Sequence, residues 1–269
     1  MGTDKRNRKK ENRRQRLDDL AKQQHRRRTR KRITRLVIVI ASVVGVTFII
    51  WVSRGDDAVT STDTTPSTQA SQTAEGAAIT GETPCPAIDG SSERAASFEN
   101  APPNCLEDGK TYSAVVTTNK GEFTIALDSQ KAPLAVNSFV TLARYQYFDN
   151  TQCHRAIPEF VVQCGDPTAT GSGGPGYAFA DELPQQGEYT IGSIAMANSG
   201  PDTNGSQFFI ITGEQGATLP PSYTLFGQVT DGLDTTVPAL NAAANPDPAA
   251  NGVPPLETLT IVSVNIIES

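Results

Sequence analysis

The chain has 269 residues and a formal net charge of −6, enough length for one sizeable domain with extensions. Residues 1–35 carry 16 Lys and Arg against 4 Asp and Glu, whereas the later residues carry 7 against 25. Net charges of +12 and −18 indicate that the two parts lie in different surroundings. The composition argues against a metal site, because there are only 2 histidines and no cluster of ligands.

An apolar run follows the basic segment. Residues 36–52 are uncharged and mostly apolar, which fits a helix that crosses about 30 Å of hydrocarbon. Because the cationic flank lies on its N-terminal side, the positive-inside rule places the N-terminus in the cytoplasm. A cleaved secretory signal is the alternative, but no small-x-small cleavage site directly follows Val52. We expect a single-pass protein of the cell membrane whose later residues are extracytoplasmic.

The segments around this run differ in composition. The basic tail, residues 1–35, has no interleaved aromatic residues, which favours membrane lipid as its partner and no specific nucleic acid. Residues 53–83 are rich in Ser, Thr and Asp and are expected to form a flexible linker. Residues 84–110 are rich in Pro and bracketed by two cysteines, which predicts an irregular cap.

All four cysteines follow the apolar run: Cys85, Cys105, Cys153 and Cys164. An even number of cysteines in an exported compartment predicts two disulfides. Four buried thiols are the alternative, which would hold if the topology were inverted.

Short strands dominate residues 111–269. Residues 112–118 and 122–127 flank Asn119-Lys120-Gly121, which predicts a hairpin, and Pro133 opens a predicted helix that ends near Tyr147. Further strand-like runs cover residues 160–164, 191–197, 207–212, 224–229 and 256–267. One or two helices among many short strands predict a β-barrel with helical caps.

Three segments carry information of another kind. They are residues 153–167 (CHRAIPEFVVQCGDP), residues 195–210 (AMANSGPDTNGSQFFI), and Gly173-Gly174 followed by residues 179–182 (FADE). In order and spacing they resemble the cyclophilin family of peptidyl-prolyl cis-trans isomerases. The resemblance implies a mainly β fold, a closed antiparallel eight-stranded β-barrel capped by two helices, with the active site in a groove on its outer surface. It covers the chain from about Tyr112 onward.

The resemblance also implies the site residues. Carried over residue by residue, it assigns catalysis to Arg155, Phe160 and Gln163, and substrate binding to Val161, Ala197, Asn198, Gln207, Phe209, Leu219 and Tyr223. Arg155 would hydrogen-bond the nitrogen of a twisted imide, and Gln163 would hold Arg155 in place or bond the substrate carbonyl. Rotation about the imide breaks no bond, so no cofactor is expected. His154 is interpreted as structural.

Some positions depart from the family pattern. Ala217-Thr218 stand where a Trp commonly precedes the leucine matched by Leu219, and Tyr223 stands where a His is common. We therefore expect weak inhibition by cyclosporin-type compounds. Cys153 and Cys164 replace a common aromatic residue and a common glycine at the ends of a hairpin-like pair of strands. We expect the disulfides Cys153–Cys164 and Cys85–Cys105.

These features predict an enzyme that assists the folding of exported proteins at the outer face of the cytoplasmic membrane. Its expected partners are proline-containing polypeptides, and the chain is expected to be a monomer. The alternative is a non-catalytic tethered chaperone that binds Pro-containing segments. A third possibility is an envelope scaffold in which the basic tail does the main work.

Overall fold

The computed structural model describes residues 76–269. The predicted basic tail, the apolar run and residues 53–75 of the predicted linker lie outside the described residues. No helix within residues 76–269 is long and apolar enough to cross a membrane. The bounds given above for tail, membrane helix, linker, cap and domain therefore stay predictions.

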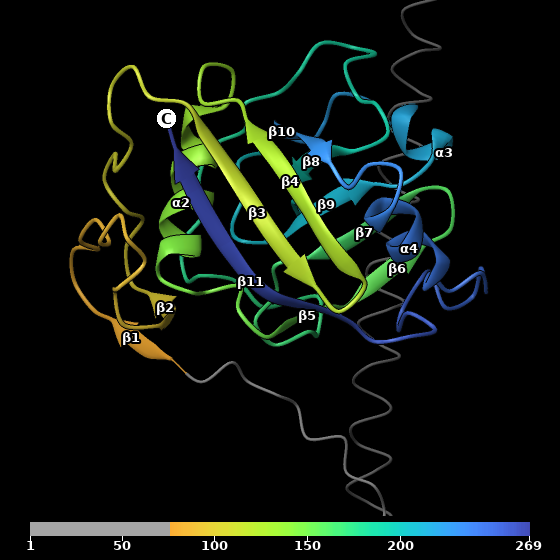
Figure 1. Cartoon of the computed structure of the whole chain (residues 1–269), viewed down its shortest axis with the longest axis horizontal. Coiled ribbons are helices and arrows are strands. Elements are labelled where there is room, and N and C mark those ends of the chain that lie inside the picture. The colour runs from red at the N-terminus through yellow and green to blue at the C-terminus, as the bar shows by residue number, and fades with distance from the viewer. Residues whose placement is uncertain (1–75) are drawn as a thin grey trace, which may run out of the picture. The chain divides into compact units, whose positions relative to one another are not determined.

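One antiparallel sheet of nine strands curves into a barrel (Figure 1). In chain order its strands are β3 (Tyr112–Thr118), β4 (Gly121–Leu127), β5 (Thr151–Cys153), β6 (Arg155–Ile157), β7 (Val161–Cys164), β8 (Ser193–Met196), β9 (Phe208–Ile211), β10 (Leu225–Asp231) and β11 (Leu259–Glu268). Their spatial order is β5-β11-β3-β4-β10-β8-β9-β7-β6. The mainly β prediction is confirmed.

The predicted number of eight strands is wrong by one, because the strand at residues 151–157 is interrupted. β5 pairs with β11, and after His154 the chain continues as β6, which pairs with β7. The sheet order therefore starts at β5 and ends at β6, and the chain itself joins the two ends at His154. The barrel is nearly closed rather than closed.

The predicted hairpin is formed by β3 and β4, which pair from Tyr112 with Leu127 to Thr118 with Gly121. Burial alternates along β3, as expected for a strand with one face toward a core. An aromatic cluster lies in the interior, next to the helix that begins at Pro133. The ring of Phe139 lies 5.0 Å from that of Phe148, 5.5 Å from Phe208 and 5.3 Å from Phe226.

Three helices occur in residues 76–269, where two were predicted: α2 (Pro133–Arg144), α3 (Glu214–Ala217) and α4 (Thr236–Ala242). α3 and α4 are only one to two turns long, too short to give a helical period in the sequence. The predicted helix that starts at Pro133 ends at Arg144 rather than near Tyr147. Its extension is prevented at Gln146, whose φ of 54° is not helical.

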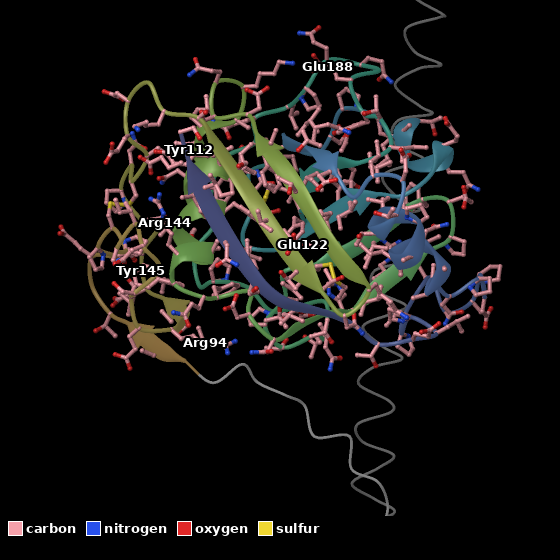
Figure 2. All side chains as sticks on the ribbon, viewed as in Figure 1. Arg94, Tyr112, Glu122, Arg144, Tyr145 and Glu188 are labelled. Atoms are coloured by element: carbon pink, nitrogen blue, oxygen red, sulfur yellow. A yellow bond between two sulfur atoms is a disulfide. The ribbon has the colours of Figure 1, made fainter. Side chains whose placement is uncertain are left out.

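A small parallel sheet of β1 (Ala77–Ile79) and β2 (Ala95–Phe98) lies beside α2 (Figure 1). An amphipathic helix usually leaves one face to solvent. Here residues 135–144 are all buried, because the barrel covers one side of α2 and residues 76–110, the N-terminal segment, cover the other. Arg144, the last of these residues, donates to Glu268 at 2.7 Å, and its guanidinium lies 5.9 Å from the centre of the Tyr112 ring. Figure 2 labels Arg144 and Tyr112 on the side of the barrel that carries α2.

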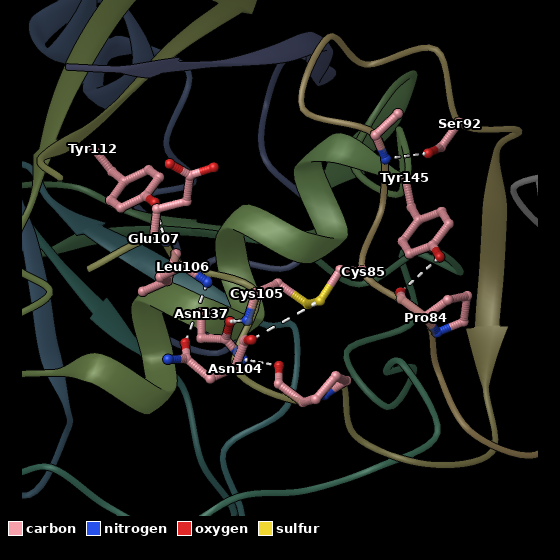
Figure 3. The surroundings of a disulfide bond; sticks show 12 residues. Pro84, Cys85, Ser92, Asn104, Cys105, Leu106, Glu107, Tyr112, Asn137 and Tyr145 are labelled. Atoms are coloured by element: carbon pink, nitrogen blue, oxygen red, sulfur yellow. Dashed lines mark hydrogen bonds between the residues drawn. A yellow bond between two sulfur atoms is a disulfide. The ribbon is translucent and has the colours of Figure 1, made fainter. Parts of the chain in front are cut away.

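Both predicted disulfides are present, Cys85–Cys105 and Cys153–Cys164. The first closes the N-terminal segment next to α2 (Figure 3). The second joins β5 to β7 beside the interruption at His154, so it links the two sides of the gap in the barrel.

Candidate active site

Four adjacent strands bring two of the three predicted catalytic residues, Arg155 and Gln163, into one row with the predicted substrate-binding residue Phe209. Arg155 on β6 pairs with Gln163 on β7, and Gln163 pairs in turn with Phe209 on β9. Phe209 pairs with Ala195 on β8. Side chains directly opposite each other in a ladder lie on the same face of the sheet, so this row shares one face.

That face is the outside of the barrel. The alternate residues of the same strands, such as Val162, Phe208 and Ile210, belong to the interior core. Val161 and Phe209 instead belong to a second, separate cluster, and partly buried apolar side chains pack against it: Phe160, Ala197, Leu219, Tyr223 and Leu225. The strands therefore build the core with one face and an apolar floor with the other.

A cavity of about 160 Å³ opens over this floor. It is lined by Arg155, Phe160, Val161, Gln163, Ala197, Asn198, Phe209, Leu219 and Tyr223. All the predicted site residues except Gln207 thus lie around one cavity, although their roles stay predictions. The rings of Phe209 and Tyr223 meet edge to face with centroids 5.2 Å apart, which fixes one wall.

Hydrogen bonds hold the guanidinium of Arg155 from two sides. Its Nη1 donates to Oε1 of Gln163 at 3.4 Å. Its Nε donates to the main-chain oxygen of Asn251 at 3.1 Å, and Nη2 donates to Oδ1 of the same residue, also at 3.1 Å. Gln163 donates in turn to Oε1 of Gln207 at 2.9 Å. The cation at the edge of the cavity is therefore oriented before any peptide binds.

Burial affects the charged and phenolic groups of the site. Partial burial lowers the pKa of Arg155, and the nearby Tyr223 opposes this shift. A guanidinium starts from a very high pKa, so it remains a cation at neutral pH. Burial raises the pKa of Tyr189 to about 12, and its hydroxyl donates to the main-chain oxygen of Tyr223 at 2.6 Å. Tyr189 thereby anchors the segment that carries Tyr223.

Sequence reasoning missed Asn251, Tyr189 and Ala195. Asn251-Gly252 gave only a turn signal in a loop rich in Pro and Ala, and nothing in its spacing connects it with Arg155. Asn198 was predicted to bind substrate. In the structure its side-chain Nδ2 donates to the main-chain oxygen of Ser222 at 2.9 Å, which ties two walls of the cavity together.

A second cavity, of about 670 Å³, adjoins the first. Gln163, Ala197 and Asn198 line both cavities, and Gln207 lies in the wall of the second. The opposite wall is formed by the glycine-rich residues 171–178, in which the main-chain oxygen of Gly173 accepts a hydrogen bond from Gln207 at 2.8 Å.

His154 lies outside both cavities. It is 7% exposed, and burial lowers its pKa, while Asp166 acts in the opposite direction. In the part of the chain that the structure describes, no group of three or more His, Cys, Asp or Glu side chains could hold a metal ion.

A nearly closed β-barrel with an apolar cavity and an oriented arginine on its outer face is the fold and site that the resemblance to cyclophilins implied. Residues 113–266 match the family model described as "Cyclophilin type peptidyl-prolyl cis-trans isomerase/CLD". The chain belongs to this family.

Relatives and solved structures agree. The chain is 41% identical over 177 residues to the "Probable peptidyl-prolyl cis-trans isomerase B" of Mycobacterium leprae, an alignment that covers 59% of this chain and 58% of that protein. It is 36% identical over 191 residues to the "Putative peptidyl-prolyl cis-trans isomerase" of Staphylococcus saprophyticus. That alignment covers 60% of this chain and 94% of that protein. A crystal structure of a Cryptosporidium parvum cyclophilin type isomerase superposes with a TM-score of 0.53 at 32% identity, covering 58% and 98%.

Proposed function

We propose that this chain catalyses the cis-trans isomerisation of peptide bonds that precede proline. One observation supports this most directly: Arg155, held by Gln163 and Asn251, lies at the edge of an apolar cavity. The Cryptosporidium parvum enzyme has also been crystallised in the presence of the dipeptide Ala-Pro. A dipeptide of that kind is the smallest ligand that we expect the cavity of this chain to bind.

Catalysis of this rotation needs a surface that binds the twisted imide bond in preference to the planar cis and trans forms. Resonance in the imide gives a rotational barrier of about 18–20 kcal/mol, so uncatalysed exchange takes roughly tens to hundreds of seconds. A protein accelerates rotation when it binds the twisted bond more tightly than either planar form. No bond forms or breaks in this reaction, and no proton has to be transferred.

The residues around the cavity supply two such interactions. The apolar side chains of Phe160, Phe209 and Leu219 hold the proline ring, so that the other side of the bond rotates against a fixed ring. In the twisted state the imide nitrogen regains a lone pair, and the guanidinium of Arg155 donates a hydrogen bond to it. Because this donor is already oriented, the protein does not reorganise as the transition state forms.

The test compares the cis-to-trans rates of an Ala-Pro peptide with the parent chain, Arg155→Ala and the control Lys131→Ala. Lys131 is an exposed cation outside the cavity. We expect Arg155→Ala to lower kcat/KM by about 10²- to 10³-fold, the loss typical of one oriented transition-state donor. Lys131→Ala should retain the parent rate. If the folded parent does not accelerate exchange, the catalytic proposal is wrong and a peptide-binding chaperone takes its place.

We further propose that the domain works on exported proteins at the outer face of the cytoplasmic membrane, as a monomer. The basic tail and the apolar run support this location, and so do two disulfides in residues 76–269, because disulfides persist mainly in oxidising compartments. Protease added to intact cells should digest residues 76–269 and spare the N-terminal tail. Protection of the domain would contradict the proposed topology, and light scattering of the purified chain tests the monomer.

A further inference from the structure

The segment before the family domain is fixed to α2 by several hydrogen bonds (Figure 3). The main-chain nitrogen of Cys105 donates to Oδ1 of Asn137 at 2.7 Å, and Nδ2 of Asn137 donates to the main-chain oxygen of Pro103 at 2.8 Å. The hydroxyl of Tyr145 donates to the main-chain oxygen of Pro84 at 2.8 Å. With the disulfide Cys85–Cys105, these bonds make residues 84–105 a rigid attachment on α2. The match to the family model begins at residue 113.

The same segment also reaches the second cavity. The main-chain nitrogen of Phe98, the last residue of β2, donates to the main-chain oxygen of Pro175 at 2.7 Å. The ring of Phe98 is 2% exposed and lies 5.4 Å from the ring of Tyr145 and 6.3 Å from that of Tyr177. Pro175, Gly176 and Tyr177 all line the second cavity. Phe98 therefore connects α2 with one wall of that cavity.

The contact between β2 and this wall leaves no free space. Gly176 has a φ of 105°, and a Cβ at this position would lie 2.3 Å from the main-chain oxygen of Phe98. Any other residue here would force the wall and the segment apart. The far end of the same wall is fixed to the barrel, because Gly173 accepts from Gln207 and donates to Asp166 at 3.0 Å. The wall is thus fixed by the barrel at one end and by the N-terminal segment at the other.

From these contacts we infer that residues 76–110 are a specificity-determining element of the isomerase, which sets the shape of the second cavity through Phe98 and Pro175. This inference rests on the proposed function in that the ligand is a proline-containing polypeptide. The substrates selected in this way are extended polypeptide segments that contain proline, rather than dipeptides. Consecutive residues advance by about 3.3–3.6 Å, so a residue two or three positions from the proline reaches the second cavity. Phe98 acts as a positioning residue that does not touch the proline.

The experiment uses the full chain and two fluorescent peptides, a capped Ala-Pro peptide and a longer one extended by several residues on both sides of Ala-Pro. The affinity for each peptide is measured by fluorescence anisotropy. The cis-trans exchange rate of each peptide is measured in a separate assay. Gly176→Ala should weaken binding of the long peptide by about two- to tenfold and leave the short peptide unchanged. In the kinetics, KM for the long peptide should rise while kcat stays constant, the pattern of lost binding that ground state and transition state share equally.

Lys131→Ala is the control, because this exposed side chain lines neither cavity. A second variant, Cys85→Ser with Cys105→Ser, removes the covalent closure within the segment without changing the loop, and it should shift the long-peptide affinity in the same direction. This variant keeps the test valid if Gly176→Ala does not fold.

The outcomes separate the two proposals. Equal long-to-short affinity ratios in the parent, Gly176→Ala and the double Ser variant would overturn the inference, whatever the catalytic rate. A shifted ratio without any acceleration of exchange by the parent would refute the proposed catalysis and retain the role of residues 76–110 in peptide selection.

Discussion

The replacement Asn251→Gly tests whether the orientation of Arg155 matters for turnover. Asn251 offers Arg155 two acceptors, its main-chain oxygen and Oδ1, each at 3.1 Å. Its φ of 50° lies in the left-handed region, which glycine adopts without strain. Asn251→Gly therefore removes the side-chain acceptor and leaves the main chain in place.

The expected size of the effect follows from that single bond. A hydrogen bond in a protein contributes about 0.5–1.5 kcal/mol, and this one is exposed to solvent, which places it toward the lower end. At about 1.36 kcal/mol for each factor of ten, kcat should fall by about two- to tenfold. KM should stay near the parent value, because under the proposed mechanism the lost interaction orients a donor that acts only in the transition state.

The assay is single-turnover and steady-state exchange of an X-Pro peptide with the parent, Asn251→Gly and two companions. Asn251→Asp retains an acceptor and should keep most of the parent kcat. Asn251→Ala loses the same bond and adds left-handed strain of roughly 1–2 kcal/mol, so its unfolding midpoint should drop further than that of Asn251→Gly. An unchanged kcat in Asn251→Gly would refute the view that Asn251 positions Arg155.

Three further outcomes are expected. Replacing Cys153 and Cys164 by Ser opens a loop with a sequence separation of 11 and should lower the free energy of unfolding by about 3 kcal/mol, measured by urea denaturation; an unchanged midpoint would contradict this. Burial lowers the pKa of His154 below 6.5, so the unfolded chain takes up this proton first, and stability should fall as the pH drops below 6.5 toward the folded-state pKa. In His154→Gln the slope of stability against pH over this window should be smaller, and an equal slope would assign the effect to another group. Cyclosporin-type compounds should bind weakly, because Leu219 is not preceded by Trp, and a nanomolar inhibition constant would refute that expectation.

The parts of the fold that could be predicted from the sequence are those with a regular pattern over several residues. The hairpin at 112–127 shows alternation on both sides of a turn, and α2 follows Pro133 with apolar residues at helical spacing. The runs that became β7 and β9 combine β-branched and aromatic residues, which favour strands. In each case the pattern extends over several residues, so it does not depend on the identity of any single residue.

The missed parts are short or depend on distant contacts. β5 and β6 have three residues each, too few to show a period, and only their pairing with β11 and β7 defines them. Of the candidate site, the residues that the motifs carry meet around one cavity, whereas Asn251 reaches Arg155 from a loop 96 positions away. No local pattern encodes a contact at that separation.

The position of Arg155 gives a physical reason for those distant contacts. β6 is the last strand of the sheet order, so one edge of it has no partner strand. Such an edge would leave main-chain groups exposed and its side chains poorly fixed. Here the loop after α4 takes the place of a strand, since Ala156 donates to the main-chain oxygen of Gly252 and accepts from the main-chain nitrogen of Asn245, both at 3.0 Å. The same loop delivers Asn251 to the guanidinium.

The gap in the barrel and the fixed arginine are therefore connected. A strand paired on both sides would satisfy the main chain of β6, but a regular ladder offers no acceptor aimed along the outer face at Nε and Nη2. A loop in the left-handed conformation at Asn251 satisfies the edge and also turns two oxygens toward Arg155. The disulfide Cys153–Cys164 holds β5 to β7 across the gap. Stability at this gap and orientation of the catalytic candidate thus depend on the same few contacts, so we expect changes to this loop to alter turnover and stability together.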